Sequence, residues 1–504
     1  MLVQQKITPF LLVSLLLLVA YNGFSTFGVP FGSAMILSLP VLLFLLISPR
    51  RALLSTWCGL AFLPLLIRQY LGSSAYNVVN EGLVSVLWFA WIGRTMMEGH
   101  SRGVPRPMQR LGLLIFAVSV VSLVVNRTNP VYWLEWVFSY LLPVPVLAIS
   151  RTYLKDYTPK RLLKIIILFL LFQFVLNMTW HAGINPLRNH HAWLDLSCGT
   201  YGNTAATAYL MMAVIGGGLC YLASARRRAG ARLAAIVLLL LAGIQQYFTF
   251  TTHAYMFVPA VVFAPLYVVM RVRGRYLWWL MVSLLAVLLV VTVVPMPRMS
   301  GSAMQGGRMV GYSTTEYVKQ SWRSVWNGPK LDVIRRVLKV ATPIQLTVGM
   351  GPNSAVSYTG FLLRSPQTTR LIGEWFYTIS GRNELSTGSI RENLFSGTVM
   401  LVSEIGIVGA ILYLLMLVYP LWLIARSVRD RKTDSPETLF LVGAVILLQL
   451  INLAVGIVWD VWRIRMLSVT LWLLAGRVWD PGQTEEDLIL AHQEIVDPLS
   501  GDQS

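Results

Sequence analysis

The chain has 504 residues, of which 56% are hydrophobic and only 12% are charged. A soluble protein of this length carries about twice that share of charged residues, and the apolar residues gather in runs of roughly 20, long enough to cross a bilayer. These runs exclude a soluble multidomain protein. The formal net charge of +19 would suggest a nucleic-acid partner in a soluble chain. Most of the charge falls in short connections between apolar runs, where it orients membrane helices, so we expect no nucleic acid.

The apolar runs predict an all-α fold, a polytopic bundle of about 14 transmembrane helices. No convincing cleavage site follows the first run, so we expect it to stay as a helix and not to be removed as a signal peptide. The approximate limits are 8–23, 33–48, 52–67, 82–97, 110–126, 131–149, 163–180, 205–223, 232–248, 254–270, 277–295, 395–423, 437–456 and 459–476. Residues 1–295 therefore form a transmembrane region, 395–476 hold the last helices, and 477–504 form an acidic tail.

Basic residues alternate between successive connections. Connections after even-numbered runs are rich in Lys and Arg, whereas those after odd-numbered runs hold Arg68, Arg127, Arg188 and little else. Because cytoplasmic connections carry the excess of basic residues, both termini are predicted to be cytoplasmic. The long connection 296–394 then lies outside, although it holds 12 Lys or Arg against five acids. Long loops are exempt from the charge rule, so this segment is interpreted as an extracytoplasmic working domain.

The outer domain contains two amphipathic stretches, Glu316–Trp326 and Lys330–Ala341. One interpretation is a pair of helices on the membrane surface, with cations facing lipid headgroups. The other is a phosphate site, because Arg offers a planar fork that binds phosphate oxygens bidentately. In the second stretch Leu331, Ile334, Leu338 and Ala341 are expected to share the apolar face. A turn rich in small residues follows at 348–353, where the backbone can approach a ligand.

Other polar residues stand at the predicted outer ends of the runs. Glu404 lies inside an apolar run, where a carboxylate is costly and is a candidate for function or helix packing. Arg188, His190 and His191 occupy an outer connection, and the histidine pair is most simply explained as part of an interfacial loop. His253 stands at the outer mouth of a run, and Arg463 and Arg465 have Asp460 as a nearby pairing partner. Neither the three cysteines nor the histidines show metal-ligand spacing, so no metal is expected.

In this order the segments resemble the O-antigen polymerase and O-antigen ligase superfamily of bacterial membrane glycosyltransferases, of the GT-C type. Residues 199–203 (Gly-Thr-Tyr-Gly-Asn) are similar to the family's Gly-x-Phe-Gly-Asn stretch. The stretch from Lys330 through Pro343 to Gly351 is similar to its long-loop pattern of a cation, a helix, Pro and Gly-x-Gly. Residues 391–394 (Arg-Glu-Asn-Leu) and 404–409 (Glu-Ile-Gly-Ile-Val-Gly) are similar to its His-Asn-x-x-Leu and Glu-x-Gly-x-x-Gly segments.

The chain departs from the family pattern at three places. Glu392 stands where the ligases have His, His253 stands where many members have Arg, and Lys330 stands where an Arg often opens the loop helix. The loss of the ligase histidine favours a polymerase over a lipid A–core ligase.

The resemblance implies a polymerase of O-antigen or exopolysaccharide type, acting on the outer face of the bacterial inner membrane without metal or other cofactor. The implied donor is an oligosaccharide on undecaprenyl pyrophosphate, and the acceptor is a second lipid-linked repeat unit. The implied partners include membrane lipids and other polysaccharide export and assembly proteins. We expect Glu392 to be the general base, and Arg391, Arg336, Arg335 and Lys330 to hold the pyrophosphate. Further substrate contacts are expected from Arg323, Gly349, Gly351, Asn393, His253, Arg188 and His190.

Three alternatives remain open. The first is a ligase-like transfer to another acceptor. The second is a flippase or other transporter of lipid-linked oligosaccharides, although such transporters usually show two related halves and no internal repeat is visible here. The third is a non-catalytic membrane subunit of an exopolysaccharide synthesis complex.

Overall fold

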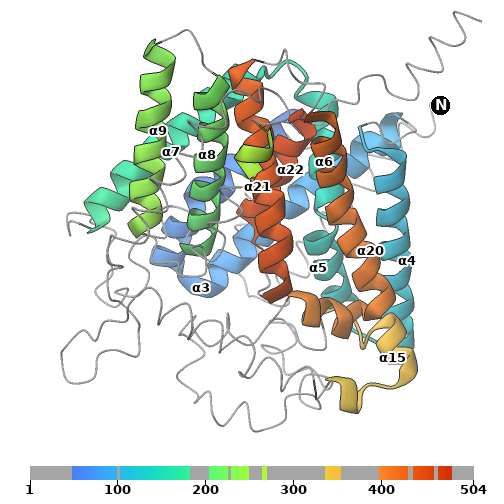
Figure 1. Ribbon diagram of the computed structural model, residues 1–504. Coiled ribbons are helices and arrows are strands. Elements are labelled where there is room, and N and C mark those ends of the chain that lie inside the picture. Colours follow the sequence, from blue (N-terminus) through green and yellow to red (C-terminus); the bar gives the residue numbers. More distant parts are fainter. Residues whose placement is uncertain are drawn as a thin grey trace, which may run out of the picture.

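The computed structural model describes residues 48–98, 103–181, 204–224, 229–248, 264–268, 335, 337–353, 397–428, 435–458, 462 and 464–478. Within these ranges the chain is helical with short connections and contains no strand (Figure 1), which confirms the all-α prediction for them. Four of the described helices are long and apolar enough to cross a membrane, or five if one bent pair counts as a single span. The count of about 14 spans stays a prediction.

The helices follow the apolar runs closely where both can be compared. Their bounds are α3 Pro49–Glu98, α4 Arg106–Asn126, α5 Pro130–Tyr140, α6 Pro143–Tyr153, α7 Pro159–His181, α8 Thr204–Ser224, α9 Ala229–Phe248, α15 Pro343–Val348, α20 Gly397–Ser427, α21 Pro436–Val458 and α22 Arg465–Val478. Of the expected run 254–270, residues 264–268 are described and helical. The runs 8–23 and 277–295, and all of 33–48 except its last residue, lie outside the described residues, as does the tail after 478.

One helix, α3, covers the two expected runs 52–67 and 82–97. Its two ends nevertheless contact the same short connection: Arg50 pairs with Asp156 at 3.4 Å, and Arg94 donates to Tyr153 Oη at 3.3 Å. A straight helix would place Arg50 and Arg94 about 66 Å apart. Thr56 Oγ1 also donates to Leu83 O at 3.1 Å. The chain therefore reverses direction within α3, as expected of two antiparallel runs.

The expected run 131–149 is not one straight helix, which corrects the sequence-based prediction of a single span. The structure divides it into α5 and α6, which are bent by 44° at their junction. Pro143 opens α6, and because proline has no backbone N–H, it cannot donate the helical hydrogen bond to the carbonyl four residues earlier. The bend separates α5, which carries Glu135, from α6, which ends at Tyr153.

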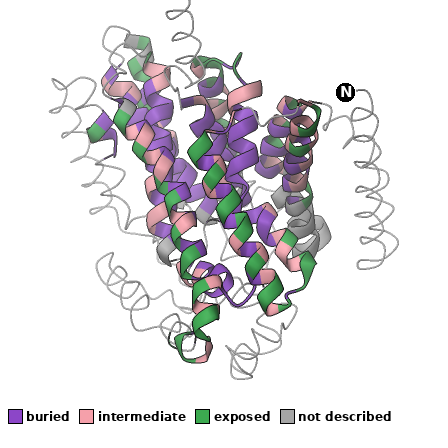
Figure 2. Ribbon diagram, turned by 90° about the vertical axis from the view of Figure 1, so that its right-hand side faces the viewer, coloured by how far each residue is buried: buried purple, intermediate pink, exposed green. Residues whose placement is uncertain are grey.

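The interior of the bundle is tightly packed, and its outward faces are apolar. Gly217 of α8 lies against α21, where an added Cβ would come within 2.6 Å of Phe440 O, and small residues of this kind let membrane helices approach closely. On the outside, Val124 of α4 is 68% exposed and Ile411 of α20 is 53% exposed. Figure 2 shows this division, with exposed residues on outward faces and buried residues within. Large exposed apolar side chains on both helices suit contact with lipid.

Basic residues from several described segments make contacts at the same end of the bundle. At one end Arg151 donates to Gly103 O and Arg477 to Lys155 O, each at 3.2 Å, close to the Arg50 and Arg94 contacts. All these segments were assigned to the cytoplasmic side. The segments assigned to the outer side contact one another elsewhere, as described below. The grouping agrees with the predicted topology, while the side of the membrane to which each end belongs stays a prediction.

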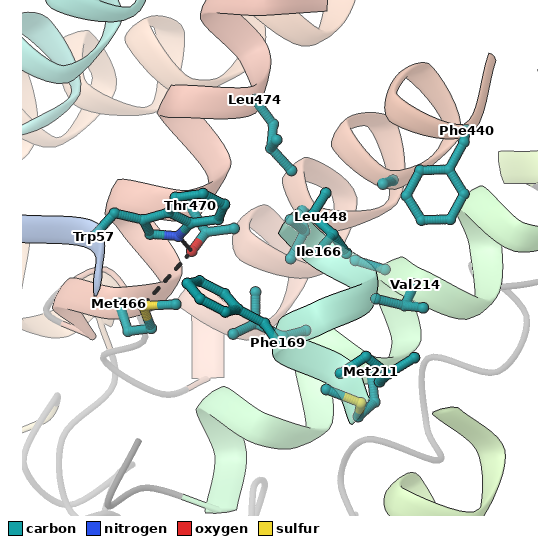
Figure 3. A pocket seen from close by; sticks show the side chains of 14 residues that line it. Trp57, Ile166, Phe169, Met211, Val214, Phe440, Leu448, Met466, Thr470 and Leu474 are labelled. Carbon is teal, nitrogen blue, oxygen red and sulfur yellow. Dashed lines mark hydrogen bonds between the residues drawn. The ribbon is translucent and has the colours of Figure 1, made fainter. Parts of the chain in front are cut away.

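An apolar cavity lies among α3, α7, α8, α21 and α22 (Figure 3). Its walls are hydrocarbon, aromatic and thioether side chains, with Thr470 as the one hydroxyl in the lining. That hydroxyl accepts a hydrogen bond from Trp57 Nε1 at 2.9 Å. The cavity offers no charged group for acid–base chemistry or phosphate binding, so a polar functional site must be sought elsewhere.

Candidate functional site

The turn that follows α15 rests directly on the backbone of α20. A capping box formed by Thr342 and Gln345 starts α15, and the helix ends at Gly349. Gly349 has φ 92° and ψ 171°, a region of backbone conformation that is essentially restricted to glycine. A Cβ atom there would overlap the peptide group between Glu404 and Ile405. Glycine is therefore required both by the turn and by the contact.

The surface that receives this turn is a break in α20. Gly406 has φ 71° and ψ 179° within an otherwise helical segment, again in the glycine-only region. The break leaves carbonyls just before it available to other donors: Met350 N donates to Ser403 O at 2.7 Å, and Gly351 N donates to Glu404 O at 3.3 Å. A Cβ on Gly406 would overlap the backbone of Thr347. The two glycine motifs singled out from the sequence thus meet backbone to backbone.

Polar side chains of α4 join the two partners of this contact. Ser122 Oγ donates to Glu404 O at 2.9 Å, and Asn126 Nδ2 donates to Gly349 O at 2.9 Å. Gln345 Nε2 donates in turn to Asn126 Oδ1 at 3.1 Å. Every one of these residues belongs to a segment assigned to the outer end of the bundle.

A charged cluster lies beside the turn, with Glu135 of α5 at its centre. Glu135 Oε1 is 3.5 Å from Arg465 Nη2 of α22, and Glu135 Oε2 accepts a hydrogen bond from Asn353 Nδ2. Asn353 is fully buried with a positive φ of 54° and also donates to Tyr132 O at 2.9 Å. Arg465, which is 6% exposed, donates to Ser139 Oγ as well. A buried cation is tolerated when a carboxylate compensates it, so the cluster ties the turn, α5 and α22 together.

Glu404 lies at the same junction and is fully buried, as expected of a carboxylate within an apolar run. Its backbone carbonyl accepts from both Gly351 N and Ser122 Oγ. The burial agrees with either role predicted for it, in function or in helix packing.

Three of the twelve predicted site residues lie in the described part of the chain. Gly349 and Gly351 form the buried turn, and Arg335 is exposed on a helical segment before α15. The structure thus brings the two glycines to the junction and leaves Arg335 on the surface. The other predicted residues lie outside the described ranges: Arg188, His190, His253, Arg323, Lys330, Arg336, Arg391, Glu392 and Asn393.

Of the apolar face expected for Lys330–Ala341, Leu338 and Ala341 are described, whereas Leu331 and Ile334 lie outside the described residues. Leu338 is 58% exposed, whereas Val337 beside it is 4% exposed and packs against the protein. Helical periodicity identifies an apolar stripe but does not tell whether protein or lipid covers it. Arg465 pairs with Glu135; the pairing with Asp460 expected from the sequence lies outside the described residues and stays a prediction.

Sequence reasoning missed Glu135, Ser122 and Asn126. Glu135 carried a usable signal, because it is a carboxylate within a predicted span, as Glu404 is. Ser122 and Asn126 are common at the ends of apolar helices and gave no such signal. Within the described ranges, no three His, Cys, Asp or Glu side chains gather in a way that would hold a metal ion.

No protein-family model matches the chain, and no curated protein matches it either.

Proposed function

We propose that the protein is a polysaccharide polymerase, of O-antigen or exopolysaccharide type, that uses undecaprenyl-pyrophosphate-linked oligosaccharide on the outer face of the inner membrane. The observation that carries the proposal is the contact between the Gly349–Gly351 turn and the break at Gly406. These are the segments that resemble two separate motifs of the O-antigen polymerase and ligase superfamily. Their backbone contact supports treating them as parts of one site.

The proposed reaction is a glycosyl transfer between two lipid-linked substrates. A hydroxyl oxygen of the acceptor forms a bond to the anomeric carbon of the donor, and the bond from that carbon to the pyrophosphate oxygen breaks. Negative charge grows on the departing lipid pyrophosphate, and cationic side chains stabilise it. Energy stored in the donor makes nucleotide sugars unnecessary. The proposed cations are Arg335, Arg336, Arg391 and Lys330, of which Arg335 is exposed.

Glu392 is the proposed base that takes the proton of the acceptor hydroxyl. It precedes Gly397, the first residue of α20, by five residues. At no more than about 3.6 Å per residue, chain length alone keeps the two Cα atoms within about 18 Å. This limit is compatible with a site that includes both the proposed base and the junction at Gly406.

The test is polymer formation by the purified protein in nanodiscs, supplied with lipid-linked repeat units from the source organism. Wild type is expected to yield polymer and to release undecaprenyl pyrophosphate. Glu392→Gln preserves shape but not basicity, so it should lower the rate by roughly 100-fold while substrate binding and the melting temperature stay close to wild type. Near-normal turnover would remove Glu392 from the mechanism and direct attention to His253 or His190.

A transporter of lipid-linked oligosaccharides is the second candidate, because a broken membrane helix such as α20 is common in transporters, where it lines the substrate site. The same preparation separates the two. A transporter would move the lipid-linked unit across a sealed vesicle and form no polymer, whereas a polymerase forms polymer from units already on the outer side.

A further inference from the structure

Two large apolar side chains project from the chain around α15. Leu338 is 58% exposed and Ile344 is 62% exposed. Val337, on another face of the same helical segment, is 4% exposed and makes the contact with the protein. Leu338 and Ile344 thus give the segment an apolar surface that the rest of the protein does not cover.

The exposed residues continue the apolar outer surface of the neighbouring helices. Gln345 of α15 hydrogen-bonds to Asn126, and just before Asn126 stand Val124 and Val125, which are 68% and 50% exposed. On the other side, the backbone of Thr347 lies against Gly406, next to Ile407, which is 47% exposed. Figure 1 shows α15 beneath the lower ends of α4 and α20. A surface that faces lipid along the helices therefore extends onto this segment.

The charges on the segment complement a phospholipid surface. Arg335 and Lys339 are exposed and lie one helical turn apart, and residues 335–353 contain no Asp or Glu. Apolar residues combined with cations and no acids are typical of segments that lie in the membrane interface, where the cations contact anionic headgroups.

We infer that residues 335–348 rest on the outer leaflet of the bilayer, with Leu338 and Ile344 among the acyl chains and Lys339 at the phosphates of anionic phospholipids. This contact with the bilayer holds the turn at Gly349 at the level of the headgroups. The inference stands on exposure, continuity and charge, with the outer side taken from the predicted topology, and it does not depend on the proposed glycosyl transfer.

Fluorescence quenching in nanodiscs tests the inference on the full-length protein. A dansyl-bearing amino acid replaces Leu338 or Ile344, with Ile411 as the lipid-facing reference and Asp156, whose side chain is 79% exposed, as the aqueous reference. Lipids with a doxyl group near the glycerol should quench positions 338 and 344 within about twofold of position 411, and iodide should quench them at least about fivefold less than position 156. Strong iodide quenching with little doxyl quenching would overturn the inference.

A second experiment tests the contact between Lys339 and the lipid headgroups. In nanodiscs with phosphatidylglycerol the doxyl quenching at position 338 should exceed that in phosphatidylcholine alone, and Lys339→Gln should remove most of this difference. Arg426→Gln, which changes a cation at the opposite end of the bundle, is the matched control and should leave it intact. Equal quenching in both lipids would refute the role of Lys339. Protection from both quenchers would indicate a protein partner, for example a second copy of the chain, and would likewise refute the lipid contact.

Discussion

Replacing Glu135 with Gln should destabilise the protein far more than a neutral substitution of similar shape usually does. The change leaves Arg465, whose side chain is 5% exposed, without the carboxylate that compensates its charge. Removing one partner of a buried ion pair costs about 3–5 kcal/mol. Because the Glu135 side chain is 24% exposed and water can replace part of the interaction, we expect the lower end, about 3 kcal/mol.

The measurement is the free energy of unfolding in mixed micelles titrated with SDS. Glu98→Gln is the matched control: Glu98, whose side chain is 21% exposed, pairs with Arg94 within one helix, and the arginine side chain is 39% exposed. Ion pairs four residues apart on one helix, with an arginine open to water, contribute only about 0.5 kcal/mol, so the two variants should differ several-fold in their loss of stability.

A double variant separates charge compensation from lost packing. Glu135→Gln combined with Arg465→Gln removes both charges while keeping groups that can hydrogen-bond to Ser139 and Asn353. The double variant should be more stable than the sum of the single losses predicts, with a coupling energy of at least about 1 kcal/mol. Equal, small losses for Glu135→Gln and Glu98→Gln, or strictly additive losses in the double variant, would refute the assignment of a buried pair.

The other predictions concern the junction, the topology and the cations. Gly406→Ala should cost at least about 2 kcal/mol, because its backbone conformation is open only to glycine and the added Cβ meets the backbone of Thr347; Gly243→Ala, with open space around it, should be nearly neutral in the same unfolding assay. A cysteine at Ser302 should react with a membrane-impermeant reagent from outside, and one at Ser427 should not; the reverse pattern would invert the topology and end the polymerase proposal. Arg336→Gln should abolish polymer at unchanged protein level, and Lys should rescue poorly because it lacks the bidentate fork; full activity of Arg336→Gln would favour a role at the membrane surface.

The helices could be predicted from the sequence because the length of an apolar run is a local property of the chain. The bounds of α8 and α21 differ from the expected runs by no more than two residues at either end, and the reversal within α3 matches two expected runs. Pro143 also gave a sequence signal for the bend, since proline removes a helical hydrogen bond. The apolar composition continues across Pro143, however, so composition alone predicts one uninterrupted run.

The junction could be predicted only in part. The glycines at 349 and 406 were visible as motifs, yet that they touch each other depends on the spatial arrangement of α15, α20 and α4. The partner of Arg465 shows the same limit. Glu135 lies 330 residues from Arg465 in the sequence and is brought close to it only by the folding of α5 next to the start of α22. Pairing across helices leaves no periodic signal in a single sequence, so neither the partner of Arg465 nor the two residues of α4 could be predicted.

The junction closes the chain between Gly351 and Glu404 into a loop. Gly351 N donates a hydrogen bond to Glu404 O, so the two ends of this stretch meet. Each end is fixed a second time, by Asn353 on α5 and by Ser122 on Glu404. Closing a loop restricts the positions its residues can reach, and positioning of reacting groups is a large part of any catalytic rate. A transfer between two substrates that both diffuse in the membrane plane needs such a fixed point. In the proposed polymerase the glycine contact would supply this fixed point, so the stability of the contact and the activity of the proposed base should be lost by different substitutions.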